Sequence, residues 1–331
     1  MLTTSMPAPG QLLLGKYRIV AHLGTGGMGD VFGAENIVTR RRVALKFIRA
    51  ELAENPVFAQ RLLREAQSAA RVDHPNVIDV HDVRQSGGML FLVMEHLDGE
   101  PLASRLGRER MAIRDVVTLL AKAARGVEAL HAAHVLHRDL KPDNIFLVSR
   151  GEHALPEPKI IDLGIAKLLH DGTTATLTAA GALIGTPAYM SPEHLLGAPF
   201  DERCDVYALG LVLYEALTGV QPFDAPTVPM SVARTLTFEA PLPRSLRPDL
   251  SRELEAVVMA AIAREPARRI PCMTSFLRAL APFADEAQIT GATRRGRAPE
   301  RTGPAFACAP TLAVGACAAP VVTAQPMICL S

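Results

Sequence analysis

The spacing of apolar residues changes at about Gly99, and this change constrains the fold more than any other feature of the sequence. Over residues 17–48, apolar and polar residues alternate around glycine turns, which is typical of β-strands. Strand-like segments return at 77–83 and 89–96, whereas beyond Gly99 apolar residues recur at helical spacing. The sequence therefore predicts an α+β protein with a small, strand-rich N-terminal lobe and a larger, helical C-terminal lobe.

Helices are expected in both lobes. In the small lobe, 56–71 has helical spacing, with Asn55 as a candidate N-cap and Pro56 at the first helical position. In the large lobe, helical spacing covers 113–133, 205–219, 254–263 and 275–280. The second of these segments is apolar nearly all round, so we expect a buried helix that ends at a glycine.

Composition suggests where the domain begins and ends. The chain has 331 residues, enough for one large domain with a substantial apolar core. Beyond Asp285 it becomes rich in alanine and proline, which predicts a low-complexity extension. We expect a flexible leader at 1–10, a domain at 11–285 (N-lobe 11–95, hinge 95–99, C-lobe 100–285) and a tail at 286–331.

The tail leaves a second interpretation open. A cluster of four arginines precedes the uncharged run 302–331, and a basic cluster before an apolar run also fits a membrane segment. Recurrent prolines and few large apolar side chains favour a disordered extension instead. No basic residue precedes Lys16, so the N-terminus lacks the features of a signal peptide. We expect a cytoplasmic protein, with inner-membrane association through 302–331 as the alternative.

Charge and cysteine content exclude several classes of protein. The net charge is +1, so no global field favours nucleic acid as a partner. The five cysteines form no close C-x-x-C pair, and their odd number argues against a disulfide framework. For the same reason a zinc site is not expected.

The stretch His-Arg-Asp-Leu-Lys-Pro-Asp-Asn at 137–144 predicts phosphoryl-transfer chemistry. It brings a carboxylate (Asp139), a cation (Lys141) and an amide oxygen (Asn144) close together in the sequence. A carboxylate can orient a hydroxyl, an ammonium can bind the transferring phosphate, and an amide oxygen can hold Mg²⁺.

Further motifs surround this stretch. Gly24 to Gly29 followed by Val31 has the spacing G-x-G-x-x-G-x-V, whose glycines would let backbone amides approach phosphate oxygens. Taken alone, this loop would be an ordinary hairpin turn, and Lys46 in "VALK" a surface lysine. Asp162-Leu-Gly follows an apolar strand, "KII", and Gly185 to Glu193 reads Gly-Thr-Pro-Ala-Tyr-Met-Ser-Pro-Glu.

Together, and in this order over residues 17–282, these motifs resemble bacterial eukaryotic-type (Hanks-type) serine/threonine protein kinases. The resemblance implies the bilobal protein kinase fold, with one helix in the β-rich N-lobe. It also implies ATP- and Mg²⁺-dependent phosphorylation of serine and threonine side chains of proteins, with Mn²⁺ as an alternative metal. Autophosphorylation of an activation loop in signalling is part of the same expectation.

The resemblance assigns roles to individual residues. Asp139, Lys141, Lys46, Glu65 and Thr186 would be catalytic, with Glu65 pairing with Lys46, and Asn144 and Asp162 would hold the metal. Leu163 stands where the family usually has phenylalanine, which affects the energetics of switching rather than metal binding. Nucleotide binding is expected from Leu23, Gly24, Thr25, Gly26, Gly27, Met28, Gly29, Val31, Ala44, Lys46, Met94, Glu95 and Leu97.

Other assignments concern substrate docking and activation. Lys141-Pro142 and Thr186 fit the serine/threonine class. Glu193 would pair with Arg269, because a lone buried carboxylate is costly. Asp205 would anchor the backbone of the catalytic loop. Activation is expected to require phosphorylation of threonines between 167 and 185, with Thr176 and Thr178 favoured over Thr173 and Thr174.

Two other functions stay open beside this one. A catalytically weak kinase-fold scaffold would usually lack Lys46, Asp139 or Asp162, and all three are present. A small-molecule phosphotransferase usually lacks a docking segment like 186–193. Protein substrates are the expected partners; nucleic acid is not expected, while membrane contact through the tail and a transient kinase dimer stay open.

Overall fold

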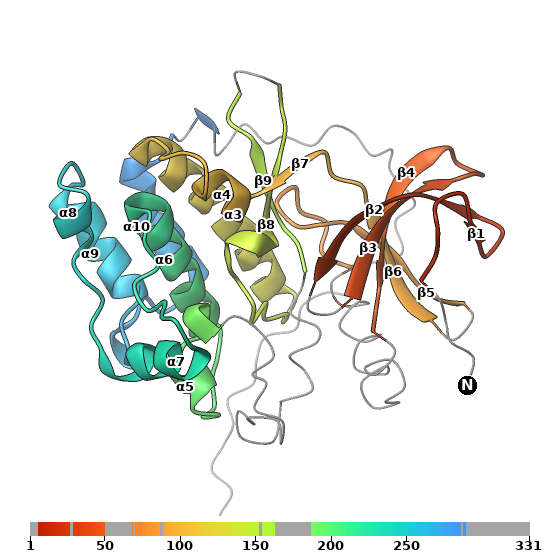
Figure 1. Ribbon diagram of the computed structural model, residues 1–331. Coiled ribbons are helices and arrows are strands. Elements are labelled where there is room, and N and C mark those ends of the chain that lie inside the picture. The colour runs from red at the N-terminus through yellow and green to blue at the C-terminus, as the bar shows by residue number, and fades with distance from the viewer. Residues whose placement is uncertain are drawn as a thin grey trace, which may run out of the picture. The chain divides into compact units, whose positions relative to one another are not determined.

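The computed structural model describes residues 6–26, 29–49, 68, 70–86, 89–151, 154–162, 187–285 and 287–288 (Figure 1). Most of the predicted helix at 56–71 lies outside these ranges. Ser68 is helical and residues 70 and 71 form a turn, so no helix extends to the predicted end at residue 71. The expected tail, apart from residues 287 and 288, also lies outside the described residues.

The N-terminal part of the domain is built on an antiparallel sheet with the strand order β1-β2-β3-β4-β6-β5. Its strands confirm the predicted β-rich lobe (Figure 1). They are β1 (Leu12–Leu13), β2 (Tyr17–Gly26), β3 (Gly29–Asn36), β4 (Arg41–Phe47), β5 (Val80–Ser86) and β6 (Met89–Glu95).

The two faces of this sheet bury different sets of side chains, because successive residues of a strand point to opposite faces. On β4, Leu45 and Phe47 belong to a compact cluster with Phe32 and Phe91. The rings of Phe47 and Phe91 stack at 5.0 Å between centroids. Ala44, on the other face of β4, joins the large core that continues into the helices. One face thus stabilises the sheet, and the other faces the rest of the domain.

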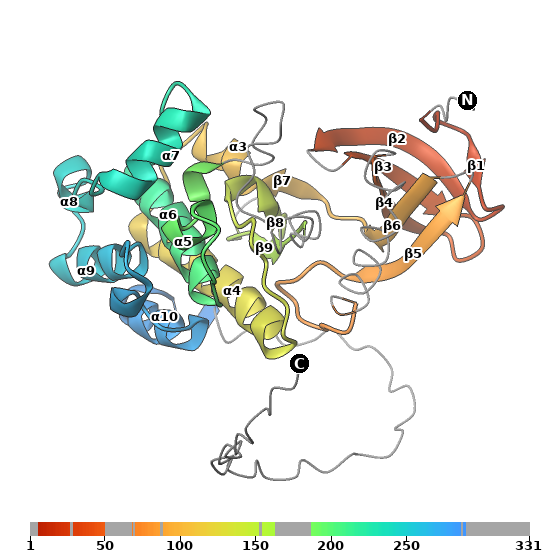
Figure 2. The same cartoon turned by 90° about the horizontal axis from the view of Figure 1, so that it is seen from below.

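The C-terminal part is mainly helical. Its long helices are α4 (Ile113–Ala132) and α6 (Arg203–Thr218), and α6 contacts α4, α9 and α10 (Figure 2). The remaining helices are α3 (Leu102–Leu106), α5 (Pro192–Leu195), α7 (Val228–Thr237), α8 (Pro243–Leu246), α9 (Arg252–Ala261) and α10 (Met273–Leu280). Short 3-10 turns are η1 (Pro142–Asn144), η3 (Pro187–Tyr189), η4 (Pro266–Arg268) and η5 (Ala281–Phe283).

A second, three-stranded sheet lies beside the helices and carries the predicted catalytic segment. It has the order β7-β8-β9, with β7 (Gly99–Pro101), β8 (Ile145–Val148) and β9 (Glu157–Ile160). β8 starts directly after Asn144, and β9 ends two residues before Asp162. The sheet therefore positions both predicted metal ligands at strand ends.

The predicted helices of the large lobe are confirmed, with ends that differ by one or two residues. Helix α6 is buried over most of its length and ends at Gly219, which adopts φ 79° as a left-handed C-cap. One strand prediction was wrong in its start. The expected strand 77–83 begins at Val80, because Val77 instead forms a parallel bridge with Ile160.

Candidate active site

The predicted catalytic residues of segment 137–144 lie together in the structure. The amide nitrogen of Asn144 donates to the backbone oxygen of Asp139 at 2.7 Å and to its Oδ2 at 3.1 Å. Lys141 Nζ lies 3.5 Å from the same Oδ2. The turn η1 brings Asn144 back toward Asp139. A carboxylate, an ammonium and an amide thus share one small region, with Asn144 Oδ1 left as the atom through which Asn144 would hold a cation.

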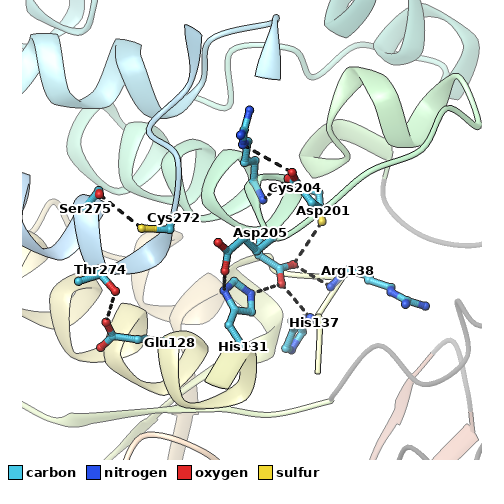
Figure 3. Close-up of polar contacts among 12 residues, drawn as sticks. Glu128, His131, His137, Arg138, Asp201, Cys204, Asp205, Cys272, Thr274 and Ser275 are labelled. Atoms are coloured by element: carbon cyan, nitrogen blue, oxygen red, sulfur yellow. Dashed lines mark hydrogen bonds and ion pairs between the residues drawn. The ribbon is translucent and has the colours of Figure 1, made fainter. Parts of the chain in front are cut away.

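Asp205 fixes the backbone at the start of this segment, as predicted (Figure 3). Its Oδ2 accepts from His137 N at 2.8 Å and from His131 Nε2 at 2.8 Å, and its Oδ1 accepts from Arg138 N at 2.8 Å. Arg138 has φ 63°, a left-handed conformation that is strained for a non-glycine residue. The bonds to Asp205 compensate for this strain.

The carboxylate of Asp205 is fully buried. Burial alone would raise its pKa, but the hydrogen bond and charge of His131, with the backbone of His137, bring the pKa below its ordinary value. Asp205 therefore acts as a buried anion that accepts hydrogen bonds, which suits an anchor for backbone amides.

The segment also binds the strand that leads to Asp162. Ile161 N donates to Asn144 O at 2.9 Å, and His137 Nε2 lies 3.1 Å from Ile161 O. These contacts hold the backbone next to Asp162 against the backbone of Asn144. An amide oxygen and a carboxylate are oxygen ligands of the kind that a hard divalent cation prefers. The donor set therefore fits the predicted metal site.

Lys46 reaches Asp162 from the N-terminal sheet. Lys46 lies on β4 between Val31 and Leu92, and only 6% of its surface is exposed. Its Nζ forms an ion pair with Asp162 Oδ1. The structure thus joins a buried cation of one sheet to the acidic residue that follows β9. The predicted partner of Lys46, Glu65, lies outside the described residues.

The face of the sheet around Lys46 carries the expected nucleotide-pocket residues. Ala44 pairs with Met94 on β6, and Val31 pairs with Lys46, so these side chains share one face. Leu23 lies near the same face, since a Cβ added at Gly33, the partner of Ala44, would meet Leu23 Cδ2 at 3.5 Å. Leu97 packs on the large core. The arrangement provides apolar walls beside a cation.

The glycine loop is closed by polar contacts between β2 and β3. Asp30 Oδ1 accepts from Thr25 Oγ1 at 2.6 Å and lies 3.0 Å from His22 Nε2. The hydrogen bonds from Thr25 and then His22 lower the pKa of Asp30. Gly29 has φ 148°, and a Cβ there would lie 1.8 Å from Phe47 O, so only glycine fits. A backbone oxygen thus occupies the space that a side chain at Gly29 would need, near the tip of the loop.

The predicted pair of Glu193 and Arg269 is present and is bidentate. Arg269 Nη1 donates to Glu193 Oε1 at 2.7 Å, and Nη2 donates to Oε2 at 3.0 Å. Burial alone would raise the pKa of Glu193, but Arg269 brings it below its ordinary value. The guanidinium also lies 4.8 Å from the centre of the Tyr207 ring. The pair fixes the end of the expected docking segment.

Sequence reasoning missed two residues of this region. His131 lies on the core-facing side of α4, one turn after buried Val127, and a histidine at such a position is a signal for a buried polar partner. Tyr189 OH donates to Glu215 Oε2 and so ties the docking segment to α6. Burial raises the pKa of both the Tyr189 hydroxyl and the Glu215 carboxyl.

Several predicted site residues lie outside the part of the chain that the structure describes. They are Gly27, Met28, Glu65, Leu163, Gly164, Thr173, Thr174, Thr176, Thr178, Gly185 and Thr186. Among the described residues, no helix is both long enough and apolar enough to cross a membrane.

Comparisons with known proteins agree on one family. A sequence profile named "Protein kinase domain" matches residues 17–278. Serine/threonine-protein kinase Pkn1 of Myxococcus xanthus is 39% identical over 266 residues, which cover 80% of this chain and 38% of that protein. PknA of Mycobacterium tuberculosis is 36% identical over 310 residues, covering 92% of this chain and 68% of that protein.

Solved structures give the same result. The crystal structure of the Mycobacterium tuberculosis PknI kinase domain has a TM-score of 0.66 and 28% sequence identity. The likeness covers 84% of this chain and 100% of that chain. The kinase domain of PknI is thus matched over its whole length. The match to Pkn1, in contrast, spans 38% of the length of that protein.

Proposed function

Because the chain belongs to the protein kinase domain family, we propose that it transfers the γ-phosphate of ATP to serine and threonine side chains of proteins. The names of its relatives confirm the predicted class, the bacterial Hanks-type serine/threonine kinases. The likeness to PknI confirms the predicted bilobal kinase fold. The family uses ATP and a divalent metal; for this chain we propose Mg²⁺, with Mn²⁺ as the alternative.

One observation carries the proposal. Two groups of residues contact each other although they come from different parts of the sequence. One group is Asp139 with Lys141 and Asn144, and the other is Lys46 with Asp162. The backbone hydrogen bond from Ile161 N to Asn144 O joins them. A base, two cations and two oxygen ligands therefore lie around one region. This is the set of groups that phosphoryl transfer requires, because its catalysis depends on positioning and on charge stabilisation.

Each residue then has a role. Asp139 orients the substrate hydroxyl and accepts its proton, since its carboxylate is held in place by Asn144. Lys141, 3.5 Å from that carboxylate, binds the transferring phosphate. Lys46 binds the other phosphates of the nucleotide, and Glu65 orients it. Bound Mg²⁺ would neutralise charge on the phosphates, and Asn144 and Asp162 are the residues that would hold it.

The nucleotide base is proposed to lie against the face of the sheet that carries Val31, Ala44 and Met94. The backbones of Glu95 and Leu97 would bond the adenine edge, while the glycine loop from Gly24 to Gly29 covers the phosphates. Apolar walls with a few polar groups are typical of sites for such ligands. Thr186 is proposed to contact Asp139 and Lys141 and to favour a serine or threonine hydroxyl.

Two alternatives are less well supported. A scaffold without catalysis has no reason to keep a buried Lys46 paired with Asp162 next to an ordered Asp139, because a buried charge is costly. A small-molecule phosphotransferase does not need the docking segment that Arg269 fixes through Glu193. Protein substrates are therefore the proposed class of acceptor.

The test is phosphate transfer from radiolabelled ATP to a generic protein substrate, followed by phosphoamino-acid analysis. We expect phosphoserine and phosphothreonine without phosphotyrosine, and loss of transfer when EDTA removes the metal. Restoring Mg²⁺ should recover transfer. Binding of ATP without any transfer would favour the scaffold, and transfer to small molecules alone would favour the second alternative.

A further inference from the structure

The side chain of Glu95, at the end of β6, is held on both sides. Its Oε1 accepts from Asp79 N at 2.8 Å and from Lys159 Nζ. The backbone closes the same contact, since Glu95 N donates to Asp79 O at 3.0 Å. Side chain and backbone of Glu95 are therefore both attached to the segment that precedes β5.

Lys159, on β9, connects this cluster to the C-terminal sheet. Besides Glu95, its Nζ donates to Val77 O at 3.2 Å. The side chains of Lys159 and Glu95 are 17% and 26% exposed, so water screens their attraction less than at an open surface. Backbone hydrogen bonds also connect the segment before β5 to β9. Ile78 N donates to Ile160 O at 2.9 Å, and Ile160 N donates to Asn76 O at 2.8 Å.

The two ends of this ion pair lie next to opposite sides of the proposed site. Glu95 begins the hinge at 95–99, whose backbone is proposed to bond adenine. Lys159 lies three residues before Asp162, on the strand that is held to Asn144 through Ile161. A rigid connection here would fix the distance between the base-binding backbone and the residues proposed to hold the metal.

We propose that the ion pair of Lys159 and Glu95 positions the hinge for nucleotide binding, so that Lys159 is a positioning residue for ATP affinity. The inference rests on the proposed function, since it assigns the hinge to adenine. Neither side chain is proposed to touch the reacting atoms. Their loss therefore weakens nucleotide binding more than it slows phosphate transfer at saturating ATP.

The substitutions Lys159→Met and Glu95→Gln separate charge from shape. Methionine keeps much of the lysine side chain without its charge, and glutamine keeps an oxygen that can accept from Asp79 N. We expect either substitution to raise the ATP KM about five-fold, and the double substitution about five-fold as well, because the two residues act as one unit. Lys159→Arg should restore near-normal KM.

Arg84→Met is the matched control. Arg84 lies on β5 and pairs with Asp82 at 2.6 Å, so this substitution also removes an ion pair of the same sheet, away from the hinge. We expect its KM for ATP to match that of the unmodified chain. Thermal unfolding of every variant shows whether it folds. If Lys159→Met does not fold, Glu95→Gln alone is used to test the inference.

The measurements are initial rates against ATP concentration and, separately, the Kd of the full chain for AMP-PNP by calorimetry. Parallel rises in KM and Kd, with kcat within about two-fold, support the inference. Three results would each overturn the inference. They are the same KM for ATP in Lys159→Met as in Arg84→Met, increases in KM that multiply in the double variant, and a raised kcat. A chain that binds AMP-PNP but transfers no phosphate refutes the proposed function instead, and the Kd series still tests the ion pair.

Discussion

Replacing Arg269 with methionine is expected to destabilise the domain by several kcal/mol, about 3–5. Its guanidinium is fully buried and donates to Glu193 twice and to the backbone oxygens of Arg203, Ala263 and Arg264, at 2.9, 3.1 and 3.2 Å. All five N–H donors of an arginine thus have acceptors. Removing it leaves the carboxylate of Glu193 buried without its cation.

The magnitude follows from the cost of an unpaired buried charge. Breaking a buried pair by removing one partner costs about 3–5 kcal/mol. At roughly 2–4 °C per kcal/mol for a domain of this size, the Tm should fall by about 6–20 °C. Glu193→Gln should cost less, because the guanidinium would keep its three backbone acceptors and the Tyr207 ring.

The assay is thermal unfolding of both variants as a function of pH. The folded pKa of Glu193 is lowered, so the pair contributes stability that is present above the unfolded pKa and is lost as pH falls through the folded pKa. The difference between the unmodified chain and Arg269→Met should therefore be largest near neutral pH and shrink in acid. A Tm of Arg269→Met within about 2 °C of the unmodified chain at pH 7, or a larger loss of Tm in Glu193→Gln, would show that the buried pair does not stabilise the domain in this way.

Three further predictions concern the loop anchor, the activation segment and the tail. Asp205→Asn replaces one acceptor with a donor facing a backbone N–H, so kcat should fall about 10- to 100-fold; an unchanged kcat would contradict the anchor role. Mass spectrometry of active enzyme should find phosphate on Thr176 or Thr178, or else on Thr173 or Thr174, because an added phosphate could pair with Arg138; four unmodified threonines would exclude this mechanism. Truncation after Asp285 should leave Tm and turnover nearly unchanged, since the prolines and few large apolar residues of the tail leave it little to bury; an insoluble or inactive product would show that the tail packs on the domain.

Four of the described helices, α4, α6, α9 and α10, could be predicted because their periodicity is local. The predicted helix 113–133 matches α4, since its buried residues recur at helical spacing along one segment. Short elements gave no comparable signal. Helices α5 and α8 have four residues each, little more than one helical turn, so neither shows a repeated period. Strand β5 starts late because Val77 pairs with Ile160, far away in the sequence.

The candidate site likewise contains residues that the sequence predicts and contacts that it does not. Asp139, Lys141 and Asn144 could be found from the sequence because they belong to one short motif. The partners of His131 and Lys159 could not, since Asp205 and Glu95 lie 74 and 64 residues away and no local pattern joins them. Such contacts depend on how strands and helices pack, which spacing alone does not specify.

The substitution Asp139→Asn shows whether Asp139 acts as the base of phosphate transfer. Asparagine keeps the shape and the contact with Asn144 but cannot accept a proton. With ATP and a generic protein substrate both saturating, kcat should fall about 10²- to 10⁴-fold, as expected for loss of a general base. The Kd for AMP-PNP, measured on the same preparation, should stay nearly unchanged, because the role proposed for Asp139 is in proton transfer and not in nucleotide binding. Near-normal turnover by this variant would show that Asp139 is not the base.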